Sequence, residues 1–211
     1  MSQTSVARPR ASSPPVAAPP VELRLTPDVD LTVSAAGFAE LCRLNSDLRL
    51  ELSASGTLIA MAPAGSDTGH ANAGITARLF IWNETARLGY VFDSSAGFTL
   101  PNGAIRAPDA SWIERSRYDA LTPDQRKAFA HICPDFVIEL RSPSDSQPKV
   151  RDKMVEYLAQ GARLGWLIDP ISVTAEIYRP GRDPQILERP ASLDGEDVLP
   201  GFRLDLTGIL T

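Results

Sequence analysis

The sequence predicts a mixed α/β fold, in which helices flank a mixed β-sheet and a β-hairpin forms an extension on the N-terminal side. One strand–helix unit carries much of this prediction. Residues 136–140 alternate with period 2, and Val150, Met154 and Leu158 follow at helical spacing. Along the rest of the chain, runs of strand-like segments are flanked by helical ones, which favours a sheet with helices packed on its faces.

The first elements of the predicted domain are a helix and a hairpin. Ser34 is expected to cap a short helix that contains Phe38. Residues 48–52 and 57–61 read as two strands, and the small residues Ser53-Ala54-Ser55-Gly56 between them predict a hairpin turn.

The middle of the chain is expected to hold a long helix and three strands. A loop over 62–69 leads into a helix over 70–88, and Gly89 stands where such a helix would stop. The strands that follow are predicted at 90–93, 97–100 and 105–113. Pro108 inside the last of them indicates a sheet edge, a strand start or a bulge.

The C-terminal part begins with a short helical insertion that starts with Thr122-Pro123-Asp124, and then contains the strand–helix unit described above. Gly161 is expected to end that helix. The remaining strands are predicted at 164–168, 174–178 and 186–187, the last two as a hairpin.

Composition limits the classes of function. We expect one folded domain over 28–211, preceded by a disordered Pro/Ala/Ser-rich tail over 1–27. The formal charge of −5 argues against a broad basic surface for nucleic acid but leaves a local patch open. Cys42 and Cys133 lack metal-ligand spacing and read as buried reduced thiols. Without a long apolar run or a signal peptide, the expected compartment is the cytoplasm.

Two carboxylates are expected on neighbouring strands, Asp109 after Pro108 and Glu139 on the strand over 136–140. Carboxylates brought together repel unless a cation joins them, and Mg²⁺ suits one or two carboxylates plus water and phosphate oxygens. Arg141 and Lys153 are the candidate basic partners, because a nearby cation would stabilise charge or position water.

Asp109 followed by Glu139-Leu140-Arg141 resembles the PD-(D/E)xK nuclease pattern. The wider sequence is similar to one branch of that superfamily, the Uma-two family of putative restriction endonucleases. The resembling segments are LRLE at 48–51, IAMAP at 59–63, His70 at a helix start, FVIE at 136–139 with SPS at 142–144, and Lys153 to Gly161 leading into WLIDP at 166–170.

This resemblance implies a restriction-endonuclease-like core and a divalent cation, Mg²⁺ or Mn²⁺, held by Asp109 and Glu139. It implies that the basic residue of the site is Lys153, from the helix after the strand. Arg141 departs from the pattern, because lysine normally stands there and arginine is a poor proton acceptor.

The resemblance also implies that Glu51 and His70 lie near the site. Each candidate has a structural alternative: a turn residue after proline for Asp109, an ion pair between Glu139 and Arg141, an exposed helix lysine for Lys153, a solvated hairpin carboxylate for Glu51 and a helix-start residue for His70.

The sequence therefore predicts a metal-dependent endonuclease that hydrolyses phosphodiester bonds, with DNA as its partner and no membrane association. A homodimer is an open possibility, because cutting both strands usually requires two sites. One alternative is a catalytically inactive nuclease-fold protein that binds nucleic acid or a protein partner. Another is a metal-dependent hydrolase of a smaller phosphate ester.

Overall fold

The computed structural model describes residues 31–61, 63–127 and 129–210, so the predicted tail over 1–27 lies outside the described residues. The helices are α1 (Ala35–Leu44), α2 (Ser66–Ala86), α3 (Arg115–Asp119), α4 (Pro123–Lys127) and α5 (Gln147–Ala159). The strands are β1 (Arg49–Leu52), β2 (Leu58–Met61), β3 (Gly89–Asp93), β4 (Phe98–Thr99), β5 (Ile105–Arg106), β6 (Ala110–Glu114), β7 (Ala130–His131), β8 (Phe136–Leu140), β9 (Leu164–Asp169), β10 (Thr174–Tyr178), β11 (Gln185–Glu188), β12 (Ser192–Asp194) and β13 (Arg203–Asp205).

A six-stranded mixed sheet forms the centre of the domain, in the order β11-β10-β9-β8-β6-β3. Strands β8 and β9 are parallel, and α5 makes the crossover between them, whereas the other neighbours are antiparallel. This architecture confirms the predicted class, a mixed sheet flanked by helices.

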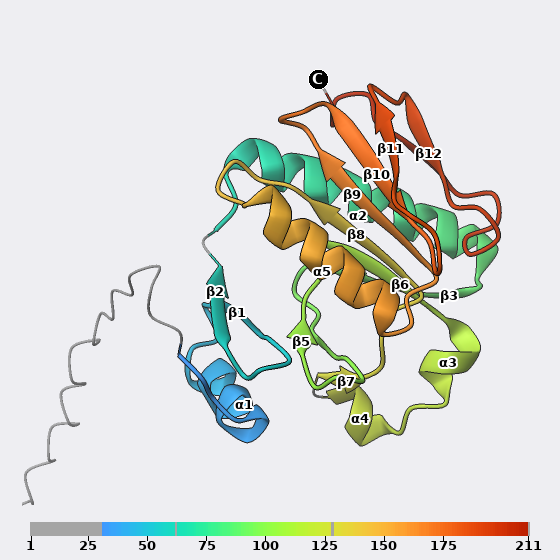
Figure 1. Cartoon of the computed structure of the whole chain (residues 1–211). Coiled ribbons are helices and arrows are strands. Elements are labelled where there is room, and N and C mark those ends of the chain that lie inside the picture. Colours follow the sequence, from blue (N-terminus) through green and yellow to red (C-terminus); the bar gives the residue numbers. More distant parts are fainter. Residues whose placement is uncertain (1–30, 62, 128, 211) are drawn as a thin grey trace, which may run out of the picture. The chain divides into compact units, whose positions relative to one another are not determined.

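Helices cover both faces of this sheet, with α5 on one side and α2 on the other (Figure 1). The alternation along β8 explains the two layers. Phe136 and Ile138 pack in one core cluster with Ile75 of α2, whereas Val137 packs in a second cluster with Met154 of α5. Glu139 follows the same period as Val137 and therefore faces α5.

The predicted N-terminal hairpin is present and belongs to a second sheet, of five strands, in the order β2-β1-β5-β4-β7. Ser34 caps α1 as predicted, since its Oγ accepts a hydrogen bond from the Gly37 N–H at 3.1 Å. Helix α1 packs on this sheet through Phe38, which is buried with Leu52 of β1. This packing holds β1 beside the short strand β5 that precedes β6.

Two boundaries differ from the predictions. Helix α2 begins at Ser66 instead of residue 70, with Asp67 in its first turn, where a negative charge is favourable. It ends before Gly89, because Arg87 adopts a left-handed conformation with φ 54°. The strand predicted over 105–113 is interrupted at residues 107–109, since Pro108 cannot donate to a ladder, and the second half starts at Ala110.

Both cysteines are free thiols, as predicted, although only Cys133 is buried and Cys42 is partly exposed. Burial raises the pKa of the Cys133 thiol to about 12. Within the described ranges, none of the helices has the length and apolar character needed to cross a membrane.

Candidate active site

Asp109 and Glu139 meet at the ends of the paired strands β6 and β8. Ala110 pairs with Ile138, so the same antiparallel register continued by one residue sets Asp109 opposite Glu139. The Leu140 N–H donates to Asp109 Oδ2 at 2.9 Å, which fixes the aspartate at the end of β8. The structure thus brings together the two carboxylates that the sequence assigned to neighbouring strands.

Lys153 reaches this pair from the second turn of α5. Its Nζ lies 2.9 Å from Glu139 Oε1 and 2.8 Å from Glu51 Oε1, and it also donates to the Ala107 carbonyl at 3.4 Å. The side chain is only 14% exposed, so the lysine is a buried partner of two carboxylates and not a solvated helix residue.

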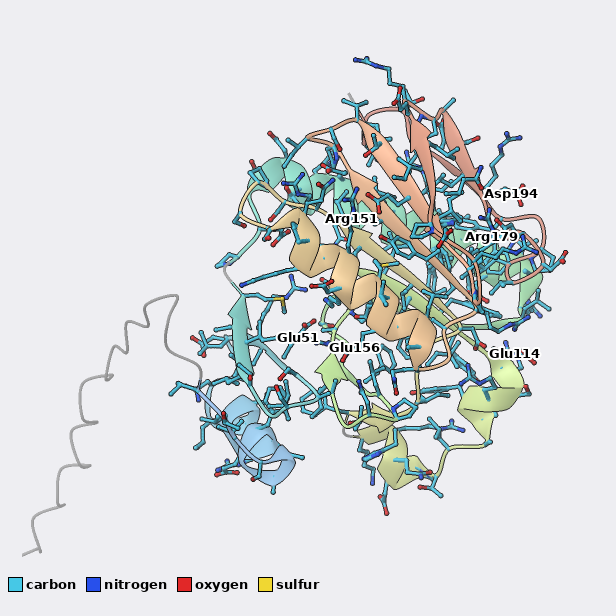
Figure 2. All side chains as sticks on the ribbon, in the orientation of Figure 1. Glu51, Glu114, Arg151, Glu156, Arg179 and Asp194 are labelled. Carbon is cyan, nitrogen blue, oxygen red and sulfur yellow. The ribbon has the colours of Figure 1, made fainter. Side chains whose placement is uncertain are left out.

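Glu51 is buried as well, at 2% exposure, although hairpin carboxylates are commonly solvated. Its Oε1 accepts a hydrogen bond from the Ala107 N–H at 2.9 Å, and its Oε2 lies 3.2 Å from Arg106 Nη1. Figure 2 shows Glu51 reaching from the hairpin toward the side of α5 that carries Glu156. The five-stranded sheet therefore supplies a third carboxylate to the site.

Two site residues were missed in the sequence. Tyr157 lies one helical turn after Lys153 and donates from its hydroxyl to Glu139 Oε1 at 3.2 Å. The i, i+4 spacing could have indicated that Tyr157 lies beside Lys153. Arg106 joins Glu51 to Glu156, with its Nε 2.6 Å from Glu156 Oε2. No sequence pattern pointed to Arg106, because it stands in a strand of two residues.

The three carboxylates share one buried lysine, and their pKa values reflect this imbalance. Burial raises the pKa of Glu139 to about 8 and, although Lys153 opposes the shift, Asp109 and Glu51 add to it. Burial also raises the pKa of Asp109, against the Leu140 N–H bond and Lys153. Burial opposes ionisation of Glu51 too, but Lys153, the Ala107 N–H and Arg106 lower its pKa on balance.

The ammonium of Lys153 is held in its charged form. Burial alone would lower the pKa of this group, but the carboxylates of Glu139 and Glu51 raise it above the usual value. Lys153 is therefore a hydrogen-bond donor and a positive charge at neutral pH, and not a free amine.

Arg141 lies beside β9 and is engaged there. Its Nη1 is 2.8 Å from Asp169 Oδ2, and its Nε donates to the Asp145 carbonyl at 3.3 Å. Asp169 is fully buried. Arg141 thus pairs with Asp169, and no ion pair with Glu139 occurs in the described part of the chain.

His70 occupies an exposed position in the early part of α2. Among residues 31–61, 63–127 and 129–210, no hydrogen bond or ion pair joins it to the carboxylates. The contact from α2 comes instead from Asn72, whose Nδ2 lies 3.5 Å from Asp109 Oδ1. The Oδ1 of Asn72 is buried without a hydrogen-bond partner in the described structure.

The donor set of Asp109 and Glu139 fits a hard divalent cation. Both provide oxygen ligands, both have raised pKa values, and an added cation would relieve the repulsion between them. Mg²⁺ is commonly bound by one or two carboxylates, with water and substrate oxygens completing its octahedron. The described residues contain no group of three or more His, Cys, Asp or Glu side chains arranged for a metal, so protein carboxylates alone would not saturate the ion.

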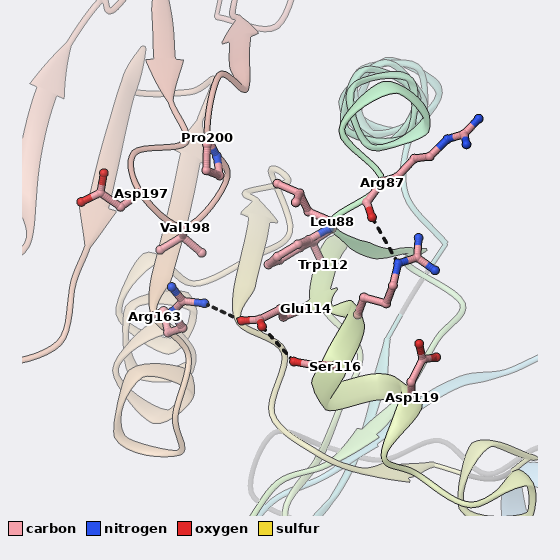
Figure 3. A pocket seen from close by; sticks show the side chains of 11 residues that line it. Arg87, Leu88, Trp112, Glu114, Ser116, Asp119, Arg163, Asp197, Val198 and Pro200 are labelled. Carbon is pink, nitrogen blue, oxygen red and sulfur yellow. Dashed lines mark hydrogen bonds and ion pairs between the residues drawn. The ribbon is translucent and has the colours of Figure 1, made fainter.

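A separate pocket of about 570 Å³ lies at the opposite end of β6, where Glu114 ends the strand. Figure 3 shows that several of its polar residues contact one another, as Glu114 bonds both Arg163 and Ser116. None of the six predicted site residues lines it. We therefore place the candidate site at the Asp109 end of β6.

The chain is thus a mixed α/β protein with a candidate acidic site, Asp109 and Glu139, at the ends of adjacent strands. The chain belongs to the Uma2 family, described as "Putative restriction endonuclease", which it matches over residues 35–207. This finding confirms the resemblance seen in the sequence.

The fold is similar to that of a solved structure, the crystal structure of a putative nuclease belonging to DUF820 from Anabaena variabilis ATCC 29413. The TM-score is 0.65 at 22% sequence identity, over 76% of this chain and 89% of that chain. No curated protein matches the chain.

Proposed function

We propose that this protein is a metal-dependent endonuclease that hydrolyses phosphodiester bonds in DNA, with Asp109 and Glu139 as ligands of Mg²⁺ or Mn²⁺. The observation that carries the proposal is the convergence of Asp109, Glu139 and Lys153 from two strands and the crossover helix between β8 and β9. Membership of the Uma2 family, described as "Putative restriction endonuclease", supports the reaction class.

Each group of the site has a role that its surroundings support. When bound, the cation would polarise the phosphodiester and lower the pKa of a bound water. Lys153, held protonated, would donate a hydrogen bond to the attacking water or to the developing charge on phosphate. Glu51 and Glu139 fix the position of that ammonium from two sides. Tyr157 holds Oε1 of Glu139.

Arg141 would contact a substrate phosphate at the border of the site. Its pairing with Asp169 orients the guanidinium, which has five N–H donors, and leaves some of them available for a substrate. Arginine binds phosphate through two parallel hydrogen bonds, which suits such a role. His70, exposed on α2, would lie on the solvent side of the substrate path.

The test is a cleavage assay on plasmid and linear DNA, with Mg²⁺, Mn²⁺ or EDTA. Cleavage should require the metal and should be lost in Asp109→Ala. The matched control is Asp124→Ala, because the Asp124 side chain is 93% exposed and lies far along the chain from either strand end. Cleavage that persists in EDTA, or in Asp109→Ala, would contradict the proposal.

A second candidate is a nuclease-fold protein that binds nucleic acid or a protein partner without cutting. The Arg141–Asp169 pair favours it, because arginine stands where the superfamily pattern has lysine and is bound to a neighbouring carboxylate. Metal-independent DNA binding without cleavage under any metal would support this candidate. Activity on nucleotides but not on DNA would instead indicate a hydrolase of smaller phosphate esters.

The proposal also covers where and how the protein acts. We expect it to act in the cytoplasm, and a homodimer would supply two candidate sites, because each chain carries one. Sedimentation of the protein with and without DNA measures the oligomeric state.

A further inference from the structure

A groove of about 890 Å³ lies beside the candidate site, between α2 and the segment from β3 to β4. We call it the α2 groove. Its α2 wall is formed by Asn72, Ala73, Thr76, Ala77 and Phe80, which follow helical spacing and so present one face of the helix. Arg49 of β1 and residues 91–96 form the other walls.

The groove connects directly to the carboxylates. Asn72 lines it and contacts Asp109 at 3.5 Å. On the opposite side, Asp93 pairs with Ala110, so the next residue, Ser94, stands beside Asp109 at the strand ends. A substrate strand with a phosphate at Asp109 could therefore continue into the groove.

The lining chemistry suits a nucleotide. Phe80 is 51% exposed, although it is a large aromatic side chain in the wall of a cavity. Among the described residues that line the groove, Arg49 is the only positively charged one and Asp93 the only negatively charged one. The Nη2 of Arg49 donates to the Ser94 carbonyl at 2.9 Å, which fixes the guanidinium beside the groove. The Oδ1 of Asn72, another residue that lines the groove, is buried and has no hydrogen-bond partner in the described structure.

We propose that the α2 groove binds an unpaired nucleotide next to the scissile phosphate, with Phe80 stacking on the base and Arg49 contacting the adjoining phosphate. The volume lies within the range of small-ligand pockets, so one nucleotide fits in the groove while the rest of the DNA stays outside. Aromatic stacking tolerates any base, because every base has a π-face. The inference rests on the proposed function and narrows its substrate to DNA with a single-stranded stretch, such as a gap or flap.

The test measures binding of fluorescent oligonucleotides by anisotropy, in EDTA and again in calcium. The probes are a perfect duplex, the same duplex with a single-stranded gap, and a single strand. Phe80→Ala should weaken binding of the gapped and single-stranded probes by at least about fivefold, the lower end of base–aromatic stacking. Phe80→Trp should retain binding, since indole also stacks.

Ile81→Ala and Arg78→Gln are the matched controls for Phe80→Ala and Arg49→Gln, because they change residues of α2 that do not line the groove. Ile81→Ala removes the adjacent apolar side chain, which is 66% exposed and does not line the cavity. Arg49→Gln should reduce the slope of log affinity against log salt by about 0.7 for a single strand, as expected for one lost phosphate contact. Arg78→Gln removes an exposed charge of α2 outside the groove and should leave the slope unchanged.

Equal affinities of Phe80→Ala and Ile81→Ala, or equal binding of duplex and gapped probes by the wild type, would overturn the groove assignment. Metal-dependent plasmid cleavage by the same preparation would show that the nuclease proposal survives that result. Absence of both DNA binding and cleavage would overturn both proposals.

Discussion

Lys153 and Glu139 form a buried ion pair between α5 and β8, with Nζ 2.9 Å from Oε1. The pair joins the crossover helix to the strand on which it packs, and Glu51 contacts the same ammonium from the other sheet. Lys153 therefore contacts two of the three carboxylates, and Arg106 pairs with Glu51 as well, so Asp109 is the carboxylate without a cationic contact in the described structure and a divalent cation could be bound there.

Metal binding should depend on Asp109. Addition of Mn²⁺ is expected to raise the melting temperature of the wild type by several degrees at a hundredfold excess over Kd, equivalent to about 2.7 kcal/mol. Asp109→Ala should abolish this rise, and Asp124→Ala should preserve it. Differential scanning fluorimetry measures the effect, and an equal shift in all three proteins would place the metal elsewhere.

The stability of the metal-free protein should depend on pH through Glu139. Its pKa is raised from the usual 4.5 to about 8, so the folded state binds a proton that the unfolded state releases. The contribution is complete below about pH 4.5 and is lost as the pH rises through about 8, with a total on the order of a few kcal/mol.

Glu139→Gln removes this titration, because glutamine resembles the protonated acid and does not ionise. Urea titrations in EDTA give the unfolding free energy of the wild type and of Glu139→Gln. The wild-type value minus the variant value should fall as the pH rises from 5 to about 8. A difference that increased with pH would mean that the Glu139 pKa is lowered.

Catalysis should depend on Lys153. Lys153→Ala is expected to reduce the single-turnover cleavage rate by about a hundredfold or more, the scale of a lost catalytic donor. Lys149→Ala, an exposed lysine of the same helix, should cut at the wild-type rate. Arg141→Ala should mainly weaken binding of DNA. Normal cleavage by Lys153→Ala, together with an inactive Arg141→Ala, would mean that Arg141 is the catalytic donor and that Lys153 is not.

Burial of Glu51 should make the hairpin essential for stability. Glu51→Ala leaves Lys153 and Arg106 without one carboxylate, and breaking such a buried pair costs about 3–5 kcal/mol. Glu40→Ala breaks only an exposed pair with Arg43 and should leave the unfolding free energy unchanged. Guanidinium denaturation distinguishes these outcomes, and equal stability would show that Glu51 is effectively solvated.

Gly89 should tolerate no side chain. A Cβ there would collide with the Ile113 carbonyl oxygen and the Trp112 ring, so Gly89→Ala should destabilise by at least about 1–3 kcal/mol. Gly69, inside α2, has open space around it, and Gly69→Ala should stabilise by about 0.5–1 kcal/mol. Thermal unfolding of both variants compares the effects directly.

The strand–helix unit was predictable because its signals are local. The period-2 pattern of residues 136–140 and the helical spacing of Val150 and Met154 specify β8 and α5, and the structure retains both. Tyr157 could not be assigned to the site from the sequence, because a tyrosine on the apolar stripe of a helix is expected in the core. Its hydroxyl finds a partner only through the position of Glu139 on the facing strand.

The second sheet could not be predicted in the same way. Strands β4, β5 and β7 have two residues each, too few for a periodic pattern. Their pairing depends on contacts between distant segments, such as Leu52 opposite Ile105. For the same reason the burial of Glu51 and the role of Arg106 followed only from the tertiary structure, as did the hairpin of β12 and β13.

The crossover position of α5 has a consequence for synthesis on the ribosome. An isolated helix of 13 residues is marginal in water, so α5 should persist only once it packs on both β8 and β9. Residues through Asp169 must therefore leave the exit tunnel before Lys153 can meet Glu139. A chain truncated before β9 would carry Asp109 and Glu139 without the packing that brings Lys153 to them.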